Sequence, residues 1–97
     1  MNATSLTEGL PGADFVHAGL SDLAAGRHSV AACLVRIART RLSRAGLTLK
    51  GENHSEPELD LYRLLVAQGG DAYGRYNALL RELISFERAL DARRARL

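Results

Sequence analysis

The sequence lacks the features on which several classes of protein depend. Among 97 residues it has a single cysteine, Cys33, and no tryptophan. One thiol excludes an intramolecular disulfide framework and a zinc site built from four cysteines. No apolar run approaches the roughly 20 residues that a membrane-spanning helix needs, and residues 1–8 do not have the pattern of a signal peptide. We therefore expect a cytoplasmic protein that has no contact with a membrane.

An excess of charge or polarity is also lacking. The chain is 46% hydrophobic and 25% charged with a net charge of +2, which favours a folded domain over a disordered chain. Its length suits one domain, so residues 1–97 are predicted to form a single helical unit. Twelve of the 13 basic residues are arginine. This bias, together with abundant alanine, leucine and glycine, is typical of GC-rich bacterial genomes, and it weakens the argument from a pI of about 9.1 for nucleic-acid binding.

Proline is scarce, and glycines separate four segments with helical periodicity. Apolar residues recur every three or four positions in each segment, which is typical of amphipathic helices. Ser29 and Asp71 have side chains that can cap the starts of the second and fourth helices. The predicted helices span residues 11–25, 29–45 and 56–68, followed by a long helix of about 25 residues that begins after Asp71. The residues expected in the core include Leu34, Leu79, Leu83 and Phe86.

The connections between these helices predict how they pack. The first and second helices, and the third and fourth, are joined by only about three residues, so each pair should form an αα-hairpin. Residues 46–54 lack a sustained period and are predicted to be the loop between the hairpins, while residues 1–10 are predicted to be a flexible terminus. Ser55 and Glu58 have the spacing of a capping box for the third helix. The fold class is therefore all-α, a four-helix bundle of two hairpins with a long C-terminal helix.

The sequence offers only weak evidence for a catalytic site. Asp14, His17 and Ser21 share a face of the first helix and include the residue types of an acyl-transfer triad. A solvated helix face offers neither an oxyanion hole nor exclusion of water, so a polar outer face is the better interpretation. The ligand spacings of known metal sites and the phosphate-binding and nucleophile-elbow motifs are absent, and Cys33 is expected in the core. We expect no enzymatic activity, no metal site and no cofactor.

A basic block without acidic residues lies between Asp22 and Glu52. Within it, Arg36, Arg39 and Arg44 form the candidate basic patch on the second helix. These arginines have two interpretations, a solvated helix face or a set of contacts to nucleic-acid phosphates. The loop that follows is too long for a helix-turn-helix. Nucleic-acid binding is therefore the alternative function and not the first.

The long final helix carries the best candidate for an interaction surface. Tyr73, Asn77 and Arg81 are four residues apart and form a polar row beside the apolar positions. Arg88 and Leu90 follow where this helix should extend beyond its neighbours, and exposed apolar surface there would mark an interface. The sequence thus predicts a non-enzymatic protein-interaction module or small subunit. A homodimer is its simplest form, because a twofold contact needs only one self-complementary patch.

Overall fold

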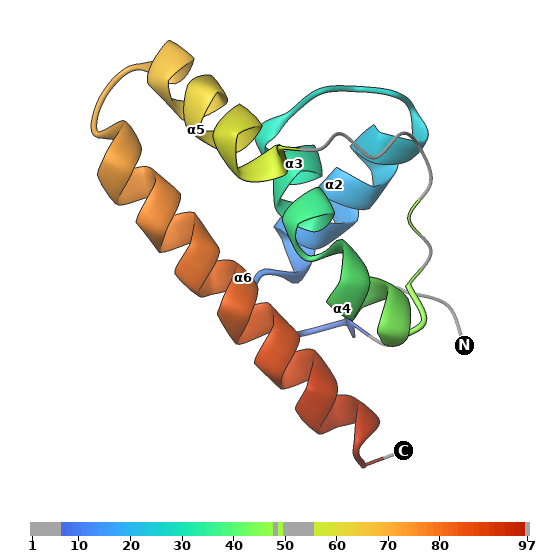
Figure 1. Ribbon diagram of the computed structural model, residues 1–97. Coiled ribbons are helices and arrows are strands. Elements are labelled where there is room, and N and C mark those ends of the chain that lie inside the picture. The colour runs from blue at the N-terminus through green and yellow to red at the C-terminus, as the bar shows by residue number, and fades with distance from the viewer. Residues whose placement is uncertain (1–6, 48, 50–55, 97) are drawn as a thin grey trace.

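The computed structural model describes residues 7–47, 49 and 56–96, and every regular element in these ranges is a helix. The prediction of an all-α fold is confirmed. The molecule measures 41 × 26 × 19 Å, and its longest helix runs along one side (Figure 1). The helices of the described ranges are α2 (Ala13–Ala24), α3 (Val30–Ile37), α4 (Arg39–Arg44), α5 (Pro57–Gln68) and α6 (Ala72–Arg94).

The prediction of one continuous helix over residues 29–45 is wrong, because the chain bends at Ala38 between α3 and α4. Ala38 is buried and has φ −90° and ψ 10°, outside the helical values. Neither proline nor glycine occurs at this position, so local composition gives no sign of the break. The bend turns α4 toward α6, where the Arg41 guanidinium lies 3.1 Å from the Glu87 carboxylate. The break therefore accompanies tertiary packing and is invisible to periodicity.

The predicted capping residues at two helix starts are confirmed. The Ser29 hydroxyl accepts a hydrogen bond of 3.1 Å from the backbone N–H three residues later, at the start of α3. The Asp71 carboxylate accepts a corresponding bond of 3.0 Å at the start of α6. Each bond satisfies a helical N–H that has no partner within its own helix. Ser55, the first residue of the capping box predicted with Glu58, lies outside the described residues.

Helix α3 occupies the centre of the molecule. It packs against α2 on one side and α5 on the other and also contacts α6 (Figure 1). All five residues from Ala32 to Arg36 are buried, so this stretch has no solvent face. Three of the predicted core residues, Leu34, Leu83 and Phe86, are buried, whereas Leu79 is partly exposed at the edge of the core.

The hairpin of α2 and α3 is held at its loop and along its length. Asp22 accepts hydrogen bonds from the Ser29 hydroxyl at 2.6 Å and from the Arg27 guanidinium at 2.8 Å, and these bonds hold its pKa below the usual value. Farther along, a Cβ built on Gly19 would lie only 2.3 Å from the carbonyl oxygen of Ala31. The two helix backbones approach closely here because residue 19 has no side chain.

The described part of the N-terminal region packs on the helices. Residues 7–10 form a turn in which the Leu10 N–H donates to the Thr7 carbonyl at 3.1 Å. The buried Thr7 hydroxyl is hydrogen-bonded to Nε2 of His17, on α2. The Arg93 guanidinium near the end of α6 donates to the carbonyl of Glu8. This turn therefore links α2 with the end of α6.

The close contact at Gly19 predicts that Gly19→Ala destabilises the protein. The added methyl group would overlap a backbone carbonyl, and overpacking of this kind costs about 1–3 kcal/mol. Urea unfolding followed by circular dichroism measures the change. Ser21→Ala, at an exposed position of the same helix, should stay within about 0.5 kcal/mol. A gain in stability for Gly19→Ala, as helix propensity alone would give, would contradict the close approach.

Phe86 is the largest fully buried side chain, and we expect Phe86→Ala to lower the free energy of unfolding by about 3–5 kcal/mol. A loss of this size is a large fraction of the total stability of a domain. The same unfolding measurement applies. Ile84→Ala, two residues away on an exposed part of α6, is the control and should cost far less. A cost below about 1 kcal/mol for Phe86→Ala would show that this position is not part of a packed core.

Candidate interaction surface

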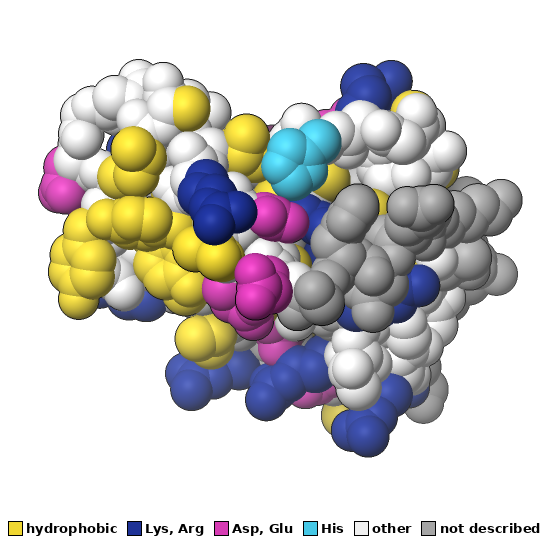
Figure 2. Space-filling model, turned by 45° about the horizontal axis from the view of Figure 1, so that its top comes forward, with side chains coloured by type: hydrophobic (Ala, Val, Ile, Leu, Met, Phe, Trp, Pro, Cys, Tyr) yellow, Lys and Arg dark blue, Asp and Glu magenta, His cyan; other side chains and the backbone are white. Residues whose placement is uncertain are grey.

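An apolar surface is exposed where α5 and α6 lie side by side. We call it the α5–α6 surface and define it by Leu59, Tyr62 and Val66 of α5 and Tyr73 and Tyr76 of α6. Val66 is 54% exposed and Tyr73 70%. Figure 2 shows hydrophobic side chains gathered on this part of the molecule. Large apolar side chains that are neighbours and exposed together are typical of binding sites.

Aromatic rings give this surface its shape. The rings of Tyr62 and Tyr76 meet edge to face, with centroids 5.8 Å apart and planes at 78°. Together with Leu59, Tyr73 and the side chain of Glu58 they line an open groove of about 370 Å³. The two rings pack against each other, and this contact fixes their orientation in the groove.

The pattern of α5 explains why this surface faces outward. Leu59, Tyr62 and Val66 are spaced three and four apart and share one face of the helix. Leu61 and Leu65 lie on another face and are buried in the core. Helix α5 is therefore apolar on two faces and buries only one. The sequence shows this broad apolar face, but periodicity alone assigns all of it to the core.

The structure brings most of the predicted interaction residues to one side of α6. Tyr73 belongs to the α5–α6 surface, and Arg81 and Arg88 are exposed farther along the helix. The Asn77 side chain donates a hydrogen bond of 3.1 Å to the backbone carbonyl of Tyr73. Exposed Ile84 lies on the same side, seven residues after Asn77. This side of α6 thus combines apolar groups with a basic border.

Leu90 is a correction to the predicted surface. It is only 2% exposed and belongs to the core cluster. Helix length alone predicts that the end of α6 extends beyond its neighbours, but α4 reaches this end through Arg41 and Glu87, and the N-terminal turn reaches it through Arg93. The end of α6 is therefore part of the monomer, and an apolar interface must lie elsewhere.

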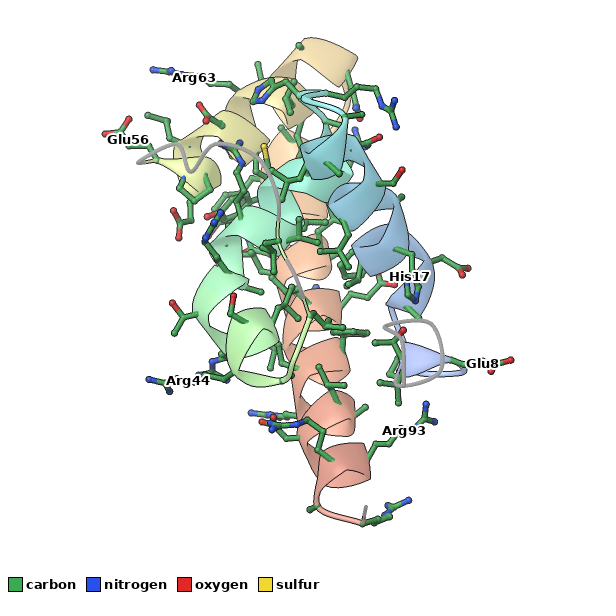
Figure 3. All side chains as sticks on the ribbon, turned by 90° about the vertical axis from the view of Figure 1, so that its right-hand side faces the viewer. Glu8, His17, Arg44, Glu56, Arg63 and Arg93 are labelled. Carbon is green, nitrogen blue, oxygen red and sulfur yellow. The ribbon has the colours of Figure 1, made fainter. Side chains whose placement is uncertain are left out.

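The predicted basic patch needs a second correction. Arg36 is only 4% exposed because it belongs to the enclosed stretch of α3. Its guanidinium donates to the Cys33 sulfur at 3.1 Å and to the Asp60 carboxylate of α5 at 3.4 Å. Arg39 is partly exposed, and Arg44 is exposed and projects outward from α4 (Figure 3). The three arginines therefore do not form one exposed patch.

Cys33 lies in the core, as the sequence predicts. Burial raises the pKa of its thiol above the usual value, although the hydrogen bond from Arg36 acts in the opposite direction. A thiol with a raised pKa stays protonated at neutral pH, and the thiolate is the nucleophilic form. Cys33 is thus held in its unreactive form.

The triad residue types on α2 have different surroundings in the structure. His17 is hydrogen-bonded to Thr7, whereas Asp14 and Ser21 are exposed. Among the residues that the structure describes, no group of three or more His, Cys, Asp or Glu side chains is placed to hold a metal ion. Over the same ranges, no helix has the length and apolarity needed to cross a membrane.

No protein-family model matches the chain, and no curated protein or solved structure is significantly similar to it.

The Arg41–Glu87 pair that joins α4 to α6 leads to a prediction of pH dependence. Glu87 is buried, and desolvation raises the pKa of its carboxyl although Arg41 lowers it. A raised pKa in the folded state means that protonated Glu87 stabilises the fold relative to the carboxylate. This contribution is fully present below the pKa of the unfolded chain and is lost as the pH rises through the folded value.

Glu87→Gln keeps an uncharged side chain at every pH. We therefore expect its stability relative to the unaltered protein to increase between about pH 3 and pH 7, because only the unaltered protein then buries a carboxylate. Thermal unfolding across this range measures the difference. Glu82→Gln, at an exposed position on α6, is the matched control and should change stability by less than about 0.5 kcal/mol throughout. A relative stability that falls with rising pH would mean that the pairing with Arg41 outweighs desolvation.

Proposed function

We propose that the protein is a non-enzymatic protein-interaction module that acts by self-association through the α5–α6 surface. The observation that carries the proposal is the exposure of Leu59, Tyr62 and Tyr73 around one groove between two neighbouring helices. Exposed Val66 lies one turn beyond Tyr62 on the same face of α5. Monomeric soluble proteins rarely expose large contiguous apolar patches, and such patches mark sites of association.

The chemistry of the surface supports this proposal. Tyrosine is enriched among the residues that contribute most to binding between proteins, because it combines a large apolar body with a polar tip. The rings of Tyr62 and Tyr76 already contact each other. Little conformational freedom is then lost when a partner binds, and this lowers the cost of association.

The arrangement of the helices, the type of assembly and the location of the protein are part of what we propose. We interpret the fold as a four-helix bundle of two hairpins, in which α3 and α4 together take the place of the second helix. A small subunit of a larger complex would use the same α5–α6 surface. We also propose a cytoplasmic location and a bacterial origin, as expected from the sequence. Nucleic-acid binding has less support than association between proteins, because burial removes Arg36 from the basic patch.

Val66→Glu tests self-association directly. We expect the unaltered protein to be dimeric at micromolar concentration, and the introduced carboxylate to weaken the dimer by roughly 100-fold, since an unpaired charge would be buried at the contact. Sedimentation equilibrium measures the dissociation constant, and circular dichroism confirms that the variant is folded. Ala78→Glu, at an exposed position on α6 outside the α5–α6 surface, is the matched control.

Two results would contradict the proposal. One is an unaltered protein that stays monomeric at the highest concentration reached. The other is equal dimerisation of Val66→Glu and Ala78→Glu, which would place the contact on a different surface.

A further inference from the structure

We infer that the groove within the α5–α6 surface binds a small soluble molecule that carries a quaternary ammonium group. The groove combines three tyrosine rings with one carboxylate, and these groups together recognise a cation that has an apolar surface. The inference goes beyond the proposed function, because it assigns a ligand to a surface for which only self-association has been argued.

All three tyrosines of the chain line this one groove. Tyr62 belongs to α5, whereas Tyr73 and Tyr76 belong to α6, so the fold brings together rings from both sides of the turn between these helices. The chain has no tryptophan and only two phenylalanines. Tyr62 and Tyr73 are exposed, and Tyr76 is only partly buried. Packing of the core therefore does not explain why the tyrosines gather here, whereas recognition of a ligand does.

The arrangement of the rings leaves aromatic faces free for a ligand. The planes of Tyr62 and Tyr76 lie at 78° to each other, with ring centroids 5.8 Å apart. An edge-to-face contact uses one face of one ring, so the other faces remain available, and two nearly perpendicular rings form a corner. Tyr73 is 70% exposed and has room to turn toward this corner. The face of an aromatic ring is the negative side of its quadrupole and attracts a cation within about 6 Å.

The charge at the groove also favours a cation. The carboxylate-bearing Glu58 lines the groove and precedes Tyr62 by four residues, so the two side chains are neighbours on α5. Among the residues that the structure describes, no lysine or arginine lines the groove. The Arg75 guanidinium donates to the Gln68 side chain at 2.6 Å, and Arg63 projects outward from α5 in Figure 3. Figure 2 shows acidic side chains at the edge of the hydrophobic patch.

The lining selects a quaternary ammonium over other cations. A primary ammonium has three N–H donors and a guanidinium has five, and each donor that leaves water needs an acceptor. The side-chain acceptors of the groove are few, namely the Glu58 carboxylate and the tyrosine hydroxyls. Methyl groups in place of the N–H donors remove this requirement and keep the positive charge. They also add apolar surface that packs on Leu59 and on the rings.

The size of the groove fits a small molecule. Its volume of about 370 Å³ falls within the range of small-molecule sites, roughly 300–1,000 Å³. The lining residues span one turn of each helix, from Glu58 to Tyr62 and from Tyr73 to Tyr76. At about 1.5 Å per residue, each of these turns is about 6 Å long or shorter. An extended peptide would continue past both ends of the groove, whereas a single head group fills it.

Choline tests the inference against its uncharged carbon analogue, in which a tert-butyl group replaces the trimethylammonium group. Tyrosine fluorescence follows binding and reports on the groove alone, because the chain has no tryptophan and every tyrosine lines the groove. Sodium chloride keeps the ionic strength constant. We expect saturable binding of choline with a dissociation constant of about 10 mM or lower. The carbon analogue should bind at least about 10-fold more weakly, because it lacks the charge that the rings and Glu58 attract.

Two substitutions separate the contributions of the ring and the carboxylate. Tyr73→Leu keeps an apolar side chain but removes an aromatic face, and it should weaken choline binding at least about 5-fold, whereas Tyr73→Phe keeps most of the affinity. Glu58→Gln keeps the size of the side chain but removes its charge, and it should weaken choline binding by a similar factor. Glu56→Gln removes an exposed charge outside the groove lining and is the matched control. Circular dichroism confirms that each variant is folded.

Three results would overturn the inference. Equal binding of choline and its carbon analogue would show that the groove recognises apolar shape without charge. Unchanged affinity of Tyr73→Leu would show that the aromatic faces do not form the site. A peptide with a trimethylated lysine that binds at least about 10-fold more tightly than choline would show that the ligand is a protein segment and not a small molecule.

These titrations are made in dilute protein, where the proposed dimer is dissociated, so their outcome does not depend on self-association. An unaltered protein that stays monomeric in concentrated solution but binds choline as expected would contradict the proposed function and support the inference. A dimer sensitive to Val66→Glu, together with dilute protein that does not bind choline, would do the reverse.

Discussion

The enclosure of α3 is the constraint on which the rest of the structure depends. Five consecutive residues, from Ala32 to Arg36, are buried, so neighbouring helices must cover this stretch on every side. Helix α2 approaches most closely, at Gly19, where a Cβ would overlap the Ala31 carbonyl. Helices α5 and α6 cover the remaining sides. A chain of 97 residues has few elements to spare after one helix has been surrounded in this way.

This shortage of covering elements leaves the α5–α6 surface exposed. Leu61 and Leu65 of α5 are used in the core, and its other apolar face has no further helix to meet among the described residues. The end of α6, in contrast, is covered, because α4 bends at Ala38 and brings Arg41 to Glu87. The exposed apolar side chains are therefore on the α5–α6 hairpin, as at Val66 and Tyr73, whereas Leu90 near the C-terminus is buried.

The parts of the structure that depend on neighbours in sequence could be predicted, and those that depend on neighbours in space could not. The caps at Ser29 and Asp71 follow from local hydrogen bonding, and the burial of Phe86 follows from helical spacing. Periodicity also places Tyr73 on the exposed side of the last helix. Periodicity carries no information on how many helices surround each face of a helix. It therefore predicts that Arg36 is exposed to solvent. For the same reason it does not distinguish the buried face of α5 from the exposed one.

The pair formed by Arg36 and Asp60 connects the centre of the molecule to its candidate function. Removing a guanidinium from water is costly, and a contact of 3.4 Å to a partly exposed carboxylate is weak compensation for that cost. Its effect on geometry is more direct. Asp60 is on the side of α5 that faces α3, and the rotation of α5 that brings it to Arg36 is the rotation that turns Tyr62 and Val66 outward. The Arg36–Asp60 contact and the burial of Leu61 and Leu65 therefore go with the same orientation of α5, in which its other apolar face is exposed.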